Sequence, residues 1–345
     1  MARTGIMICG HGSRDPEAID EIERLVTKLA PRLPEYEVAG SYLEFARPII
    51  REGLELLLEK GCERILAIPG MLFAAGHVKN DLPWEVNSFA ADHPETPIVM
   101  GRELAITPLL LKAAQERIHA AEQHAHHDVP REETCLVVVG RGTNDSDANS
   151  NVAKVARMLG EGMGFGWTEV AFSGVAHPRV DECLNRVVKL GFRRYLVFPY
   201  FLFTGVLVKR IYEQTAEVAA QFAQIEFIKA HYLDDHPLVV DAFIERIRET
   251  DKGEGAMNCQ LCKYREQIIG YEKDKGVQQA GHHHHVRGIG TDEEHRHHDH
   301  DHDEHDHSHG HGHHKGHTHE PHHGHDHDHH HDHGHGHVNP HHGKR

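Results

Sequence analysis

Two histidines and one glutamate are the side chains of this sequence whose types and positions favour metal chemistry. His11 follows an apolar run of strand length, Glu44 ends the next such run, and His77 comes a few residues after the third. Imidazole nitrogens and a carboxylate oxygen with open positions suit a divalent first-row metal such as Co, Ni, Fe or Zn. A neutral imidazole is also a base near physiological pH. The three side chains are therefore a candidate site for handling a metal ion and abstracting protons.

The chain contains the same module twice, and only the first copy keeps these residues. An offset of 130 residues (141 − 11) aligns the copies without a gap, so that Gly-His-Gly-Ser-Arg lies over Gly-Arg-Gly-Thr-Asn. At this offset His11 becomes Arg141, Glu44 becomes Gly174 and His77 becomes Leu207. A duplicated scaffold preserves what the fold needs. The positions that differ therefore indicate where the chemistry takes place.

Each copy alternates strands with helices, which predicts an α/β fold with a parallel sheet flanked by helices in each module. The expected strands are 5–9, 37–43, 64–68, 97–99, 135–139, 168–173, 194–198 and 225–228. The expected helices are 16–30, 48–60, 78–91, 107–121, 146–160, 179–190, 206–222 and 237–249. Pro48 and Pro108 suit first-turn positions of their helices. Because sites in such sheets lie beyond the carboxyl ends of the strands, we expect His11, Glu44 and His77 at one sheet edge.

The duplication, Gly-His-Gly-Ser-Arg and Phe-Ala-Ala-Gly-His-Val together resemble the class II tetrapyrrole chelatases. The resemblance covers about residues 1–270 and is nearest to the long, two-module form of the CbiX sirohydrochlorin cobaltochelatases. It implies two tandem chelatase-like modules with one active site in the gap between them. The implied activity is insertion of Co2+ into sirohydrochlorin for cobalamin synthesis, with His11 and His77 handling the metal and Glu44 as their acidic partner.

The implied substrate is a polycarboxylate, so its site should offer cations and hydrogen-bond donors. Arg141 is the first candidate, because it takes the place of His11 in the second module. Ser13, Arg14 and Arg47 are further candidates by position. The remaining candidates at strand ends are Thr143 and the cations Lys79, Arg179, Lys209 and Arg210. For most of the cations, a solvated surface charge is the competing interpretation.

The repeat predicts a first module over 1–121 that holds the active site, a polar linker over 122–133 and a second module over 134–250. A segment over 251–280 contains Cys259 and Cys262, a Cys-x-x-Cys pair that can form half of a zinc site or a redox pair. The family resemblance implies an iron–sulfur cluster there, 4Fe-4S or 2Fe-2S, with further ligands from elsewhere in the fold, from histidines or from a second chain of a homodimer.

Most of the 39 histidines follow Gly281, in a stretch of His, Asp and Gly that is too polar to form a core. We expect 281–345 to be disordered without metal and to bind Co, Ni, Cu or Zn for storage or delivery. An expression tag is the competing interpretation, but a tag is a short uniform run of histidines. Removal of this stretch should lower activity only when cobalt is scarce.

Composition excludes several classes of protein. The net charge is -16 and no basic stripe is present, which argues against nucleic-acid binding. No apolar run is long enough to span a membrane and no signal peptide is evident, so a cytoplasmic location is expected. Three alternatives stay open: iron insertion for sirohaem synthesis, a non-catalytic cobalt or nickel storage or delivery protein, and a periplasmic metal-binding protein, which the missing export signal disfavours.

Overall fold

The computed structural model describes residues 3–255, which carry both copies of the repeat. Cys259, Cys262 and the histidine-rich stretch lie outside the described residues. The expectations for the iron–sulfur cluster and for metal storage therefore stay predictions.

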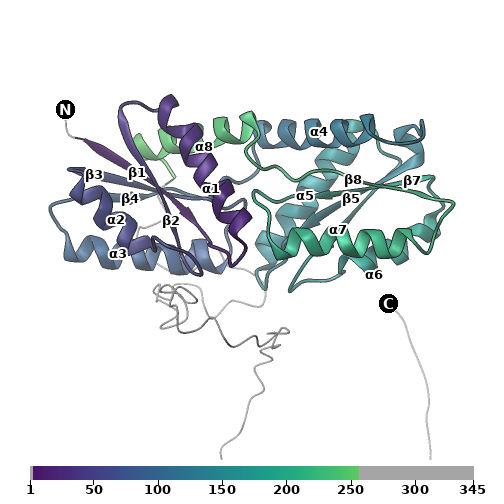
Figure 1. Cartoon of the computed structure of the whole chain (residues 1–345), viewed down its shortest axis with the longest axis horizontal. Coiled ribbons are helices and arrows are strands. Elements are labelled where there is room, and N and C mark those ends of the chain that lie inside the picture. The colour runs from purple at the N-terminus through teal and green to yellow at the C-terminus, as the bar shows by residue number, and fades with distance from the viewer. Residues whose placement is uncertain (1–2, 256–345) are drawn as a thin grey trace, which may run out of the picture. The chain divides into compact units, whose positions relative to one another are not determined.

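The first half of the chain forms four strands and four α-helices (Figure 1). The strands are β1 (Thr4–Gly10), β2 (Tyr36–Tyr42), β3 (Arg64–Pro69) and β4 (Ile98–Met100). The helices are α1 (Pro16–Leu29), α2 (Ile50–Glu59), α3 (Leu82–Asp92) and α4 (Pro108–Gln123), with a 3-10 turn η1 (Ala30–Arg32) and a π turn η2 (His77–Asp81).

The second half repeats this order. Its strands are β5 (Thr134–Gly140), β6 (Trp167–Phe172), β7 (Arg194–Pro199) and β8 (Glu226–Lys229). Its helices are α5 (Ser146–Met163), α6 (Val180–Val187), α7 (Val206–Ala219) and α8 (Pro237–Asp251), with 3-10 turns η3 (Arg131–Glu133) and η4 (Val188–Leu190). The predicted alternation of strands and helices is confirmed.

The expected start of the second helix, at Pro48, is wrong. α2 begins at Ile50, and Pro48 belongs to the loop after β2, where its carbonyl oxygen accepts a hydrogen bond from the Tyr42 amide at 2.9 Å. The Glu52 carboxylate accepts from the Ile49 amide at 2.9 Å and so caps the helix two residues later than expected. Pro108 does stand in the first turn of α4.

Each half holds a four-stranded parallel sheet, in the order β2-β1-β3-β4 and β6-β5-β7-β8. Side chains alternate between the two faces of each strand. In β1, Ile6 and Ile8 point into a core that also contains Leu136 and Val138 of the second sheet, whereas Met7 points into a core of the first half alone. The two sheets therefore share one apolar core, which fixes their edges relative to each other.

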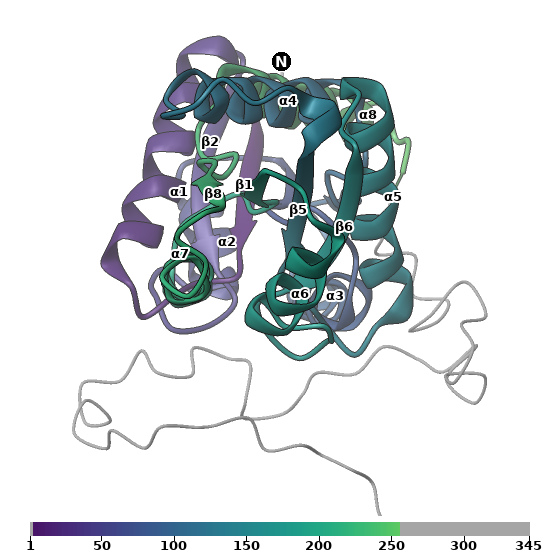
Figure 2. The same ribbon diagram turned by 90° about the vertical axis from the view of Figure 1, so that its right-hand side faces the viewer.

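The last helix of each half packs against the other half (Figures 1 and 2). α8 contacts β3 and α1, and its Asp251 carboxylate accepts from Arg64 at 2.6 Å. α4 contacts α5 and β8, and its Arg117 side chain donates to the Leu233 carbonyl at 2.9 Å. The proposed boundaries at 121 and 134 follow the repeat in the sequence, whereas the packing of the two final helices crosses them.

Candidate metal centre

The loops after β1 and β2 are joined through their backbones, which sets His11 beside Glu44. The Leu43 amide donates to the Gly10 carbonyl and the Glu44 amide donates to the His11 carbonyl, both at 3.0 Å. Gly12 has φ +92°, and a Cβ there would lie 1.7 Å from the Glu44 carbonyl oxygen. Only glycine fits this close approach, so the Gly-His-Gly sequence is what allows the two loops to meet.

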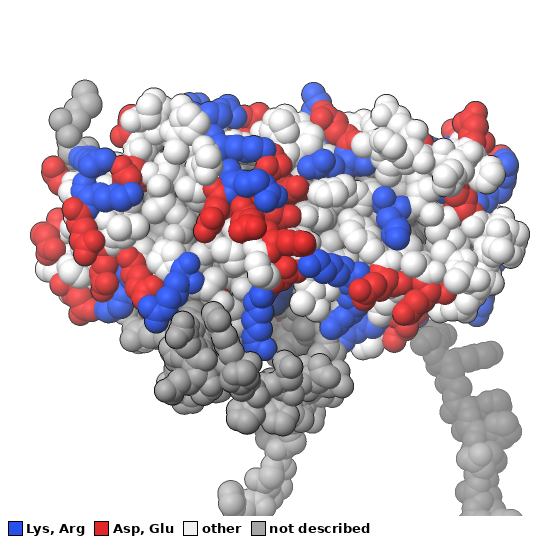
Figure 3. All heavy atoms as spheres, in the orientation of Figure 1, with Lys and Arg blue, Asp and Glu red and all other residues white. Residues whose placement is uncertain are grey.

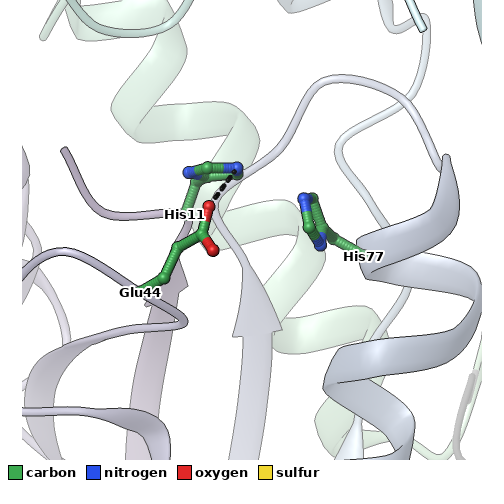
Figure 4. A group of neighbouring side chains, drawn as sticks. All are labelled: His11, Glu44 and His77. Atoms are coloured by element: carbon green, nitrogen blue, oxygen red, sulfur yellow. Dashed lines mark ion pairs between the residues drawn. The ribbon is translucent and has the colours of Figure 1, made fainter. Parts of the chain in front are cut away.

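His77 reaches the same place from the π turn that follows β3. Its ring meets the His11 ring edge-on, with the centroids 4.8 Å apart. Figure 4 shows the side chains of His11, Glu44 and His77 pointing toward one another, the first two from loops and His77 from the start of a helix. One potential ligand atom from each residue lies within 4.8 Å of those of the other two. The structure thus brings together all three residues of the expected metal site.

His11 is a neutral imidazole with one free lone pair. Its Nδ1 lies 3.0 Å from the Gly12 carbonyl oxygen, which can only accept, so Nδ1 carries the proton and donates. Burial lowers the pKa of His11 to about 3, assisted by the positive charges of Arg141 and His77. The Nε2 atom is buried and has no hydrogen-bond partner among the described residues. An orphaned buried nitrogen of this kind is free to bind a metal ion.

The Glu44 carboxylate faces this orphaned nitrogen, with Oε1 at 3.3 Å from Nε2 (Figure 4). Burial raises the pKa of Glu44, while the charges of His77 and Arg141 oppose the rise. A lone pair on Nε2 and an ionised carboxylate repel each other at this distance unless a proton or a cation lies between them. A divalent cation satisfies both atoms, so the geometry fits the metal ion of a chelation reaction as a transient ligand.

His77 has its own carboxylate partner. Its Nδ1 lies 2.8 Å from Oδ2 of Asp81, whose side chain is 1% exposed. The Asn80 side-chain amide donates to the other oxygen of Asp81 at 2.7 Å. With Nδ1 engaged, Nε2 is the atom of His77 that remains to face a metal ion.

Arg141 comes to the site from the second half. Its side chain is exposed to solvent, yet its charge acts on both His11 and Glu44. Surrounding protein atoms lower the pKa of the guanidinium through desolvation. Since water still reaches the residue, we interpret this as a cation enclosed by neighbouring groups but open on one side. The second module therefore supplies a positive charge at the position where it lacks the histidine.

The other expected substrate contacts differ in how near they lie to His11. The Arg14 guanidinium lies over the Phe45 ring at 5.1 Å, and that ring stacks beside His11 with the centroids 6.3 Å apart. Ser13 Oγ accepts from the Asp15 amide at 3.0 Å and thus helps to form the turn into α1. Arg47 pairs with Glu52 at 2.6 Å on the surface. Of these residues, Arg14 remains the strongest candidate for the substrate.

The two candidate lysines instead join the two halves. Lys79 binds Asp145 at 2.7 Å and Asp147 at 3.0 Å. Lys209, which the offset places over Lys79, binds Asp15 at 2.7 Å and Glu17 at 3.0 Å. The contacts are equivalent pair by pair, so the two copies hold each other in a pseudo-symmetric way. Acidic and basic side chains are mixed over the face shown in Figure 3, as expected for such pairing.

A sequence model of the family described as CbiX matches the chain twice, at residues 5–121 and 135–250. The chain belongs to the CbiX family. Sirohydrochlorin cobaltochelatase of Priestia megaterium is 36% identical to it over 260 residues, which cover 75% of the chain and 84% of the relative. Sirohydrochlorin ferrochelatase of Priestia megaterium is 28% identical over 233 residues, which cover 67% and 84%.

Solved structures of similar proteins include one with iron and one with cobalt. SirB from Bacillus subtilis with Fe3+ has a TM-score of 0.65 and 27% identity, and SirB from Bacillus subtilis subspecies spizizenii in complex with cobalt has a TM-score of 0.62 and 26% identity. Each match covers 74% of the chain and 99% of the solved structure. Among residues 3–255 of this CbiX-family chain, no helix combines the length and apolar character needed to cross a bilayer.

Sequence reasoning missed Asp81 in this member of the CbiX family. A signal was present, because Asp81 follows His77 by four residues and the offset places it over Ile211. The second copy therefore lacks both the carboxylate of Asp81 and the imidazole of His77. The ion pairs of Lys79 and Lys209 were also missed, because a contact between modules leaves no pattern within either one.

Proposed function

We propose that this chain is a sirohydrochlorin cobaltochelatase, which inserts Co2+ into sirohydrochlorin with loss of two pyrrole protons. Membership of the CbiX family makes it a metal chelatase, a lyase of tetrapyrrole biosynthesis. The observation that supports the site is the meeting of His11, Glu44 and His77, with ligand atoms within 4.8 Å of one another. Arg141 brings a positive charge from the other module to the same place.

Three protein ligands suit an ion that must be passed on. Two imidazoles and one carboxylate leave coordination positions open for pyrrole nitrogens, as the open position of a catalytic metal site does for substrate. Neutral nitrogen donors require no charge separation when the ion leaves. Arg141 and Arg14 supply positive charges that favour carboxylate groups on the substrate.

The pKa shifts divide the roles of these side chains. A pKa of about 3 makes His11 a weak base, so we assign it to the metal ion rather than to pyrrole protons. The raised pKa of Glu44 makes its carboxylate a stronger base than an exposed one. As the ion moves into the ring, the Glu44 carboxylate can accept one of the two pyrrole protons, and Nε2 of His77, which no longer holds the ion, can accept the other.

Iron insertion is the second candidate function, and two findings support it. A ferrochelatase relative is 28% identical, and one similar solved structure contains Fe3+. The His/His/Glu donor set suits either ion, because divalent cobalt and iron are adjacent in the first-row series and bind similar nitrogen and oxygen ligands. We favour cobalt because the cobaltochelatase relative is the more similar of the two Priestia proteins, at 36% identity.

The test is a comparison of metals. Purified full-length protein is mixed with sirohydrochlorin and equimolar Co2+, Fe2+ or Ni2+, and initial rates are read from the change in tetrapyrrole absorbance. We expect Co2+ to be inserted fastest. Faster insertion of Fe2+ would reverse the choice of metal, and the absence of insertion with all three ions would reject the proposed function.

A further inference from the structure

We propose that Asp81 is a positioning residue, which fixes the proton of His77 on Nδ1 and so directs Nε2 at the metal ion. The inference rests on the proposed function, because it assumes that His77 is a metal ligand. It adds a residue outside the ligand set to the machinery of the reaction.

The direct contact carries the first step. His77 Nδ1 lies 2.8 Å from Asp81 Oδ2. An ionised carboxylate only accepts hydrogen bonds, so Nδ1 carries the proton, and in the neutral imidazole that binds a metal ion Nε2 presents its lone pair. The second oxygen of Asp81 accepts from Asn80 at 2.7 Å, so both ends of the carboxylate are held. Ligating histidines in metal sites are commonly oriented by such a carboxylate.

The local backbone fixes the other end of His77. The π turn His77–Asp81 closes with a hydrogen bond from the Leu82 amide to the His77 carbonyl. Pro83 follows at the next position and has no amide hydrogen to continue the regular helical ladder. The main chain of His77 is thus held by Leu82 while its ring is held by Asp81, which leaves the imidazole little freedom to rotate.

The second copy shows that the fold itself does not need this carboxylate. The offset places Ile211 over Asp81 and Leu207 over His77, and Ile211 is fully buried in a regular helix, α7. An aliphatic side chain therefore suits the position. A carboxylate that is 1% exposed carries a desolvation cost unless it is paired. The chain retains that cost only in the copy that has the histidine, which indicates a role toward His77.

The experiment measures Co2+ affinity from the Co2+-dependent rise in stability of the full-length protein toward urea. Ions that bind folded and unfolded chains equally cancel in this measurement, so it isolates sites formed by folding. The variants are Asp81→Asn, His77→Ala and the double variant. Asp92→Asn is the matched control, because it removes a carboxylate from the end of the neighbouring helix where the side chain is 62% exposed.

We expect Asp81→Asn to weaken Co2+ binding about 10–100-fold, the usual effect of losing such a partner. The His77→Ala variant should lose at least as much, and Asp81→Asn should add nothing in that background, because it acts only through His77. In the insertion assay, Asp81→Asn should raise the half-saturating Co2+ concentration while sirohydrochlorin half-saturation stays unchanged, and excess Co2+ should restore the rate. Asp92→Asn should behave as wild type.

The possible outcomes distinguish a failure of the role proposed for Asp81 from a failure of the proposed metal site. Equal losses from Asp81→Asn with and without His77 would show that Asp81 acts elsewhere, and wild-type affinity in Asp81→Asn would remove its role. If His77→Ala itself keeps full Co2+ affinity, the proposed metal site is wrong. Should Asp81→Asn fail to fold, Asp81→Ile takes its place, since the second copy carries isoleucine there.

Discussion

The carboxyl edges of the two sheets have the same backbone arrangement but carry different side chains. The amide of Leu43 donates to Gly10 at 3.0 Å in the first copy, and the amide of Ser173 donates to Gly140 at 2.9 Å in the second. Gly12 and Gly142 both have positive φ. The paired loops are thus what the fold requires of both copies, while the imidazoles and carboxylates belong to the first copy alone.

The difference extends from side chains to helix geometry. The first copy enters its third helix through the π turn His77–Asp81, followed by Pro83, whereas the second has a regular helix, α7, with Glu213 over Pro83. The second copy still takes part, because Arg141 places a positive charge at the site of the first. In the proposed site the first copy thus supplies the metal ligands and the second supplies a positive charge.

The largest expected contrast is between His77 and its counterpart Leu207. His77→Ala removes a proposed metal ligand and should lower the rate of insertion more than about 100-fold, since loss of a residue that orients a ligand already costs about 10–100-fold. Leu207→Ala should leave the rate within about twofold, because the second copy has no ligand set. Initial rates at matched protein concentration give both numbers, and circular dichroism confirms that both variants fold.

Similar losses in both variants would mean that the two edges contribute equally, and the assignment of the chemistry to the first copy would fail. A normal rate in His77→Ala would have the same consequence. The contrast is informative because the two substitutions truncate side chains at equivalent positions of one repeat.

Much of this edge could be predicted from the sequence. His11, Glu44 and His77 follow three strands that parallel packing brings to one edge, and their loss in the second copy marks them. Asp81 was missed because a π turn is not visible in hydrophobic spacing. The Pro48 prediction was wrong because the loop after β2 closes on Tyr42 before the helix starts. The packing of α4 against the second half and of α8 against the first depends on contacts between the halves, which no local sequence pattern encodes.

The ion pairs that join the halves should differ in their contribution to stability. The Lys79 side chain is 12% exposed and its partner Asp145 is 6% exposed, whereas Lys209 is 47% exposed. Lys79→Met removes the cation beside the buried Asp145 carboxylate, which still accepts from the Asp147 amide. The variant should lower the free energy of unfolding by about 1–3 kcal/mol, below the range for fully buried pairs. Lys209→Met should cost less, because the Lys209 ammonium is open to water that screens the pair, although the Asp15 side chain is only 8% exposed. Urea denaturation measures both.

An equal loss in the two lysine variants would show that the halves are held symmetrically despite the difference in burial. Added salt sharpens the comparison. It should weaken the Lys209 pair more than the Lys79 pair, since buried charges are screened less.

A further expected contrast is a pH dependence of stability from His11 that Arg141, its counterpart, does not share. An unfolded histidine titrates near about 6.5, whereas His11 in the folded, metal-free protein titrates near about 3. Between these values the unfolded chain binds the extra proton. Stability is therefore fully present above about pH 6.5 and falls as the pH drops toward 3. The slope is at most about 1.4 kcal/mol per pH unit, and smaller in practice because the side chain is 29% exposed.

Two variants at equivalent positions isolate the pH dependence of stability that comes from His11. His11→Gln should gain stability relative to wild type as the pH falls from 6.5 to 4, because it has no proton to bind. Arg141→Gln removes a positive charge that lowers the His11 pKa, so it should reduce the slope without abolishing it. Glu44, whose pKa is raised, acts in the opposite direction, so differences between variants are compared rather than single curves. A difference between His11→Gln and wild type that stays constant with pH would show that His11 titrates normally, and the division of roles between His11 and Glu44 would fail.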